Sequence, residues 1–164
     1  MPLILCSQDM KIESVWDYPR PPVLEIFKGH VRIIHHDKII ADTNNAFRVL
    51  ETSHPPVFYL PPEDLAQSYL EKNGFESYCE YKGKAGYYDL TIGQEKVPKI
   101  GWYYPSPTEA FNALKDHVAF YASKLDTCLV NDVPVSAQEG DFYGGWITPN
   151  IRGPFKGGPG TFGW

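Results

Sequence analysis

The chain of 164 residues has the length of one domain, and a domain of this size buries about 70% of its extended surface without needing a disulfide or a metal. A formal charge of −5, a pI near 5.5 and the lack of any block of Lys and Arg exclude the usual nucleic-acid or anionic-membrane partner, which is bound through clustered cations. Aromatic residues make up 15% of the chain beside 15 prolines and 14 glycines, a mixture that favours short strands and many turns over long helices.

The cysteines indicate the compartment. Cys6, Cys79 and Cys128 are odd in number and far apart, which suits free thiols in a reducing environment, so we expect a cytoplasmic protein. The apolar run at residues 1–6 is too short for a signal sequence or a membrane span. We therefore expect no membrane partner, and either a monomer or a homodimer.

An N-terminal arm, residues 1–22, comes first. Its prolines force extended backbone near the end, and Trp16 is expected to anchor it to the body. Residues 31–35 and 38–42 predict a β-hairpin around a His36-Asp37 turn, and further strands are expected at residues 47–51 and 57–60.

Two short helices and a three-stranded meander are predicted next. Proline and acidic residues at the start favour a helix over residues 62–70, closed by Asn73-Gly74. The run from Ser106 to Glu109 has the spacing of a capping box and predicts a second helix through about Asp116. The expected strands are residues 75–82, 85–92, 97–104, 118–121 and 128–135, the last of these with an Asn131-Asp132 turn.

The C-terminal tail, residues 138–164, holds more than half of the glycines. Because they alternate with Trp146, Phe155 and Trp164, we expect an ordered segment packed on the body and not a flexible linker. The chain is therefore interpreted as a single domain, residues 1–164, with a mainly β core at about residues 20–140 that carries the arm and the tail.

Residues 48–56 hold the first candidate site. Val49 and Glu51 share one face of a strand, so a half-buried Glu51 carboxylate needs a partner or a proton, and either state suits acid–base work. A structural ion pair with Arg20 or Arg48 is the alternative. His54 is a candidate general base because two following prolines fix its backbone, although a structural histidine with satisfied hydrogen bonds remains the other interpretation.

A second candidate site lies at residues 78–89. A Cys79 thiol beside Lys82 ionises more readily and becomes a nucleophile, whereas a buried cysteine is otherwise a small hydrophobic residue. Lys82 is alternatively an anion ligand. In the tail, Lys156 stands among glycines, as in a phosphate cradle, but without the spacing of a P-loop.

No metal or cofactor is expected. The sequence has no C-x-x-C pair and no H-E-x-x-H motif, and the side chains of His35 and His36 would diverge on a strand.

Several motifs, taken in order, resemble the family catalogued as domain of unknown function 427. They are Asp42, Arg48 with Glu51, and residues 55–64, 79–88, 102–105 and 118–121. The resemblance covers about residues 20 to 140 and implies a small, mostly antiparallel β-fold, with sheets packed as a β-tent or an open barrel-like fold and two short helices.

The resemblance transfers no catalytic residue. The family also bears a nucleotidyltransferase label, yet this chain lacks the paired Asp motif on adjacent strands that would hold two metal ions for that reaction. Glu80 stands where many relatives have proline after the motif cysteine.

These observations together predict one pocket that binds a nucleotide, a sugar or a small acid. Its expected aromatic walls are Trp16, Tyr59, Tyr88, Trp102 and Trp146, and its expected polar groups are Arg20, Arg48, Glu51, His54, Lys82 and Lys156. One alternative is a small hydrolase or transferase with His54 or Glu51 as base and Cys79 as nucleophile. Another is a protein-interaction scaffold that uses the aromatic, proline-rich arm.

Overall fold

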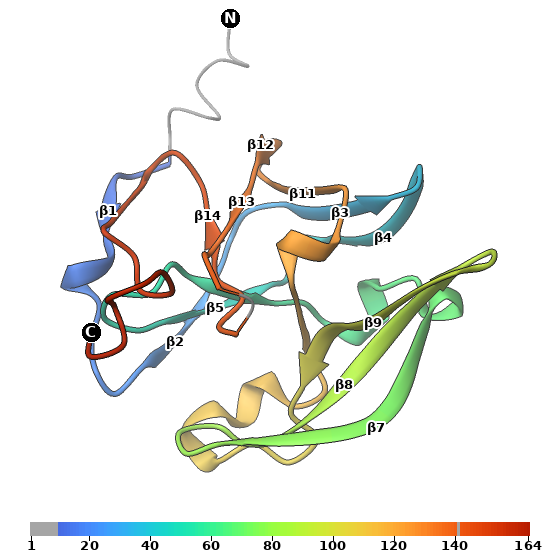
Figure 1. The fold of residues 1–164 in the computed structure, drawn as a ribbon, viewed down its shortest axis with the longest axis horizontal. Helices are drawn as coiled ribbons and strands as arrows, with labels where there is room; N and C mark the ends of the chain where they lie inside the picture. Colours follow the sequence, from blue (N-terminus) through green and yellow to red (C-terminus); the bar gives the residue numbers. More distant parts are fainter. Residues whose placement is uncertain (1–9, 141) are drawn as a thin grey trace, which may run out of the picture.

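The computed structural model describes residues 10–140 and 142–164, so Cys6, the apolar run at residues 1–6 and Asp141 lie outside the described part. The fold is mainly β, as predicted. Figure 1 shows several separate sheets, and the described strands close no barrel. Among the described strands, every pair is antiparallel except one short parallel pair that joins the arm to the tail.

The first four-stranded sheet has the order β12-β11-β3-β4. Its strands are β3 (Val31–His35), β4 (Lys38–Thr43), β11 (Thr127–Val130) and β12 (Val133–Pro134). The β3–β4 hairpin confirms the predicted pair, and both turn residues, His36 and Asp37, have positive φ of 49° and 64°. A tight hairpin turn needs this conformation because it matches the right-handed twist of the strands. Asn131 and Asp132 repeat the pattern between β11 and β12.

The second four-stranded sheet has the order β10-β9-β8-β7 and forms the long twisted ribbon at the lower right of Figure 1. Its strands are β7 (Leu70–Cys79), β8 (Gly83–Ile92), β9 (Glu95–Tyr103) and β10 (Val118–Phe120). The predicted meander is therefore confirmed, although β7 begins five residues earlier than its predicted start at Phe75.

A three-stranded sheet, β2-β5-β6, completes the framework. It contains β2 (Val23–Ile26), β5 (Phe47–Leu50) and β6 (Val57–Tyr59). An antiparallel bridge between Leu60 and Val118 ties the end of β6 to β10, so this sheet continues onto the edge of the second one.

Neither predicted helix is confirmed, because both segments form 3₁₀ turns. Residues 62–70 contain two single 3₁₀ turns, η2 (Pro62–Asp64) and η3 (Gln67–Tyr69). Strand β7 begins directly after them, at Leu70, where the chain pairs with β8. The segment is too short for its helical propensity to outweigh that pairing. Asn73 and Gly74, expected to end a helix, lie inside β7 where its pairing with β8 is interrupted.

The predicted capping box is also wrong. The turn η4 (Glu109–Leu114) is a 3₁₀ helix that starts after Thr108, and the Thr108 hydroxyl donates to the carbonyl of Tyr81 instead of capping the helix. Phe111 and Leu114 are nevertheless buried.

Two clusters of buried side chains form the core. The larger one joins the first sheet to the far end of the second and includes Ile33, Leu90 and Trp146. The smaller one is rich in aromatic residues, among them Tyr59 and Trp102, and lies where the second and third sheets meet. The candidate site is built on this aromatic cluster.

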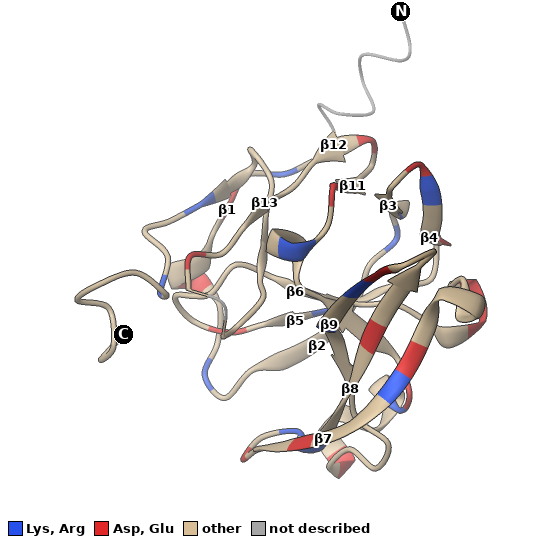
Figure 2. Ribbon diagram, turned by 45° about the vertical axis from the view of Figure 1, so that its right-hand side comes forward, with Lys and Arg blue, Asp and Glu red and all other residues tan. Residues whose placement is uncertain are grey.

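The tail contributes short strands to two pairs. These are β13 (Ser136–Ala137) with β14 (Trp146–Ile147), and β1 (Glu13–Ser14) with β15 (Ile151–Arg152). Figure 2 shows Lys and Arg interspersed with Asp and Glu along the described ribbon. Among the described residues, no helix has the length and apolar character needed to cross a membrane.

Candidate functional site

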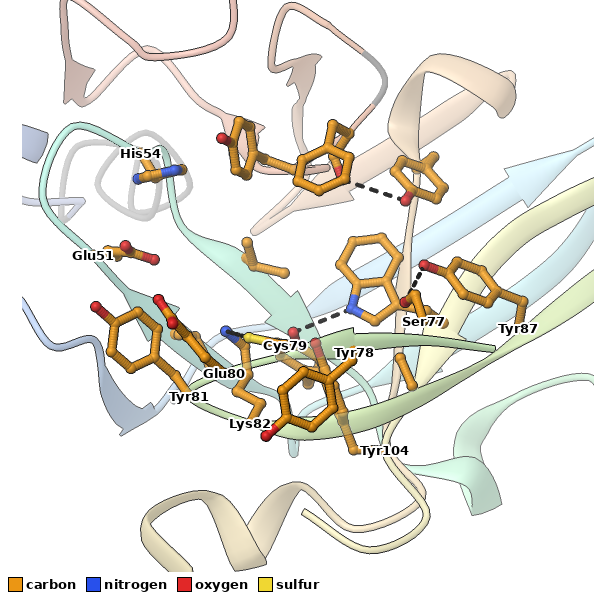
Figure 3. Close-up of a pocket in the computed structure, with 18 of the residues that line it drawn as sticks. Glu51, His54, Ser77, Tyr78, Cys79, Glu80, Tyr81, Lys82, Tyr87 and Tyr104 are labelled. Atoms are coloured by element: carbon orange, nitrogen blue, oxygen red, sulfur yellow. Dashed lines mark hydrogen bonds between the residues drawn. The ribbon is translucent and has the colours of Figure 1, made fainter. Parts of the chain in front are cut away.

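A cavity of about 440 Å³ lies between the β7–β8 hairpin, the loop that follows β5, and the tail (Figure 3). Seven of the predicted site residues line it: Glu51, His54, Tyr59, Cys79, Lys82, Trp102 and Lys156. The structure thus brings together side chains that are up to 105 positions apart in the chain. The groups fall into an aromatic floor and two polar sides.

The floor consists of packed aromatic rings. Trp102 donates its Nε1 hydrogen to the Tyr59 hydroxyl over 3.3 Å, and its ring centroid lies 4.7 Å from that of Tyr121. Tyr104 is buried beside Tyr59, with ring centroids 6.2 Å apart. Burial raises the pKa of Tyr59 and Tyr104 above the ordinary value, so both hydroxyls stay neutral and can donate hydrogen bonds.

The first polar side comes from the β7–β8 turn. The Lys82 ammonium lies 3.7 Å from the Cys79 sulfur, and Figure 3 shows the two groups pointing toward one another. A backbone hydrogen bond from Thr108 N–H to the Lys82 carbonyl, 3.0 Å long, holds this turn against η4. Lys82 is 9% exposed, whereas the thiol of Cys79 is only half-buried.

The second polar side is the loop after β5. His54 is 6% exposed, and burial lowers its pKa from the ordinary value of 6.5, a shift opposed in part by Thr52 and Glu51. Its Nδ1 lies 2.9 Å from the Thr52 carbonyl oxygen, which can only accept a hydrogen bond. Nδ1 therefore carries the proton in the neutral ring, and Nε2 keeps a free lone pair.

The tail closes the cavity. A methyl group on Gly144 would lie 2.5 Å from the Trp102 ring, so the tail backbone is in close contact with the floor. The buried Gln138 fixes this position: its amide donates to the Lys156 carbonyl over 2.7 Å, and its oxygen accepts from Gly145 N–H over 2.9 Å. Tyr143 meets the edge of the His54 ring with centroids 4.7 Å apart.

Arg20 lies beside the cavity without lining it. Its guanidinium is 3.6 Å from the Glu51 carboxylate, which is the ion pair that the sequence left open as an alternative for Glu51. Trp16 lies farther away, where its indole donates to the Pro154 carbonyl over 2.8 Å and its ring meets that of Trp164 at 5.4 Å. Both residues connect the arm to the tail.

Three other predicted residues lie outside the cavity. The buried Arg48 pairs with Glu13 and Glu25 and borders a separate cavity of about 560 Å³. Trp146 is 1% exposed and donates to the Phe120 carbonyl inside the larger core cluster. Tyr88 packs on Tyr103 in the same cluster.

Several lining residues escaped the sequence analysis. Tyr104 stands two residues after Trp102, so the alternation of side chains along the chain would have indicated it. Tyr87, and not Tyr88, shares the face of Trp102, because the register pairs Tyr87 with Trp102 and Tyr88 with Gly101. Phe142 and Tyr143 come from the tail, where no local pattern indicates an orientation.

His35 and His36 do not diverge as predicted. Their rings stack with centroids 4.3 Å apart, because the positive φ of His36 turns its side chain back over β3. With Asp126 they form a cluster whose donor atoms lie within 4.8 Å of one another. However, the lone pairs of parallel rings do not converge on one point, and His35 Nδ1 already accepts from Asp126 N–H over 3.1 Å. This arrangement is unsuited to a shared metal ion.

Comparison with known proteins gives one result. The sequence profile named NTP_transf_9, described as domain of unknown function (DUF427), matches residues 23–131. No curated protein matches the chain.

Proposed function

The chain belongs to the DUF427 family, and we propose that its cavity binds a small molecule with a flat or cyclic body. The observation that carries this proposal is the aromatic floor, which meets ionisable groups on two sides of one hollow. Ligand sites in proteins are typically concave, mostly apolar and supplied with a few converging polar groups.

The dimensions support the same proposal. A volume of about 440 Å³ lies within the range of roughly 300 to 1,000 Å³ found for small-molecule sites. Tyr59 and Trp102 line the cavity with aromatic rings, and the neutral hydroxyl of Tyr104 can orient a polar group on the ligand.

A thermal-shift screen tests the proposal directly. Nucleosides, sugars and aromatic acids are added to the protein, and a ligand at a hundred times its dissociation constant should stabilise the fold by about 2.7 kcal/mol. The blocking variant is Ser77→Trp, which places an indole at an exposed lining position of β7. The control is Glu71→Trp, on the same strand but outside the cavity.

Stabilisation should disappear in Ser77→Trp and persist in Glu71→Trp. Equal stabilisation of both variants would place the ligand elsewhere and refute the proposal.

A second candidate function is covalent catalysis with His54 as general base and Cys79 as nucleophile. The observation that favours it is the fixed tautomer of His54, which keeps the Nε2 lone pair free in a ring that lines the same cavity as the thiol. In such a reaction Nε2 takes the thiol proton as the Cys79 sulfur attacks an ester carbonyl, and then returns that proton to the leaving oxygen. The C–O bond breaks, the alcohol departs and the acyl group stays on Cys79 as a thioester.

The model ester p-nitrophenyl acetate tests this candidate. Acetylation mapped by mass spectrometry should occur at Cys79 and spare Cys128, whose burial raises its pKa to about 12. His54→Asn should slow acetylation at least tenfold at pH 7, and His117→Asn, outside the cavity, should not. Acetylation that proceeds at the wild-type rate in His54→Asn would exclude His54 as the base.

A further inference from the structure

Lys82 is a buried cation without a carboxylate partner among the described residues. Its side chain lines the cavity and is 9% exposed. Within residues 10–140 and 142–164, no Asp or Glu oxygen lies within 4.0 Å of its ammonium nitrogen. Its neighbours are the Cys79 sulfur at 3.7 Å and the Phe111 ring, whose centroid is 5.5 Å away.

Two other buried charged side chains, Arg48 and Asp89, do have polar partners. Arg48, 7% exposed, contacts both Glu25 at 2.6 Å and Glu13 at 3.3 Å. Asp89, 5% exposed, accepts hydrogen bonds from Asn73 and from the backbone of Lys99. Burial of an unpaired charge is costly, and proteins normally supply a partner, so Lys82 differs from Arg48 and Asp89 in the described part of the chain.

We propose that Lys82 binds the carboxylate of the ligand, so that the cavity takes a small aromatic or cyclic carboxylic acid. This inference rests on the proposed function. The ligand ring would lie against the aromatic lining that includes Trp102, and its carboxylate would supply the missing partner of the ammonium. An ion pair of this kind is strengthened where water is excluded, as it is around a side chain this deeply buried.

The charge of the lining favours a carboxylate over a phosphate. The described lining residues contain two cations, Lys82 and Lys156, and two carboxylates, Glu51 and Glu80. Lys156 belongs to the tail, and its ammonium lies 3.4 Å from the Trp164 carbonyl, so it has a partner of its own. One ammonium without a carboxylate partner can compensate a single negative charge, whereas the polyphosphate of a nucleotide needs several cations or a metal ion, which a lining of zero formal charge does not supply.

The test compares benzoate with benzamide, a neutral molecule of nearly the same shape, by calorimetric titration. Wild-type protein should bind benzoate at least tenfold more tightly. In Lys82→Met this preference should fall below twofold while benzamide binding is kept. Lys82→Arg, which retains the cation, should keep most of the preference. The control Lys84→Met removes an exposed lysine of the same hairpin, 63% exposed and 3.6 Å from Glu76, and should behave as wild type.

The outcomes separate this inference from the function on which it rests. Equal binding of benzoate and benzamide to wild-type protein, or a preference that survives Lys82→Met, overturns the carboxylate site but leaves a binding cavity. Binding of neither probe, together with no hit in the wider screen, overturns both. Phenyl phosphate is the third probe, and binding tenfold tighter than benzoate would replace the carboxylate with a phosphate. A urea titration verifies that each variant folds, and Lys82→Gln substitutes if Lys82→Met does not.

Discussion

Gly144 provides a quantitative test of how the tail closes the cavity. Its φ of +71° lies in the left-handed region, and a methyl group there would lie 2.5 and 2.9 Å from two carbons of the Trp102 ring and 3.2 Å from Tyr121. The left-handed backbone costs an alanine about 1 to 2 kcal/mol. Overpacking against a rigid ring adds about 1 to 3 kcal/mol. Gly144→Ala should therefore lower the free energy of unfolding by about 2 to 5 kcal/mol.

Two other glycines separate the two contributions. Gly160 has a φ of +83° with open space where its Cβ would lie, so Gly160→Ala should cost only the backbone contribution of about 1 to 2 kcal/mol. Gly163 has open space and no left-handed φ, so Gly163→Ala should stay within about 0.5 kcal/mol of wild type. Urea denaturation followed by circular dichroism measures all three. If Gly144→Ala costs no more than Gly160→Ala, the tail is not packed on Trp102 and the proposed wall is absent.

Three further predictions concern stability. Arg48→Met should cost about 2 kcal/mol in urea denaturation, because it removes the hydrogen-bonded cation from the carboxylates of Glu13 and Glu25, which are themselves partly exposed. A cost below about 0.5 kcal/mol would mean that these ion pairs are not formed. Burial lowers the pKa of His54 below 6.5, so the unfolded chain binds a proton more readily than the folded protein. The free energy of unfolding should therefore fall as the pH drops below about 6.5, by a total of about 1.4 kcal/mol for each unit by which the folded pKa lies below the unfolded one. This loss should be absent from His54→Asn, and parallel pH profiles of the two proteins would contradict it. Trp146→Phe should lower the melting temperature far more than Trp16→Phe, because the indole of Trp146 is 1% exposed and that of Trp16 is 42% exposed; equal shifts would contradict the assignment of Trp146 to the core.

The strands could be predicted because their signals are local. Alternation of apolar residues and the His36-Asp37 and Asn131-Asp132 turns indicated the hairpins of the first sheet, and all four turn residues adopt the positive φ that such turns require. The helices could not be predicted this way. Proline and acidic residues favour the first turn of an α-helix and a single 3₁₀ turn equally well. The start of β7 depends on the pairing of Leu70 with Leu90 of β8, at the far end of the hairpin, which the local sequence does not indicate.

The site was predictable where chemistry and strand alternation agreed. Cys79, Lys82 and Trp102 were expected from residue type and proved to line one cavity. Trp146 was misplaced because a large aromatic residue in a glycine-rich tail suits a pocket wall and a core equally well, and only the tertiary fold distinguishes them. Tyr88 was misplaced by one residue, since the face of a strand depends on its register with its neighbour, which the sequence of one strand does not contain.

The most direct measurement is an NMR titration of the protein with benzoate, followed through the indole N–H signals of the four tryptophans. The Trp102 indole lies in the floor of the cavity and bonds to Tyr59, whereas that of Trp146 is buried in the other cluster. We expect a saturable shift of the Trp102 signal while the Trp146 signal stays in place. A saturable shift at Trp146 or Trp16 with no change at Trp102 would contradict a binding site in this cavity.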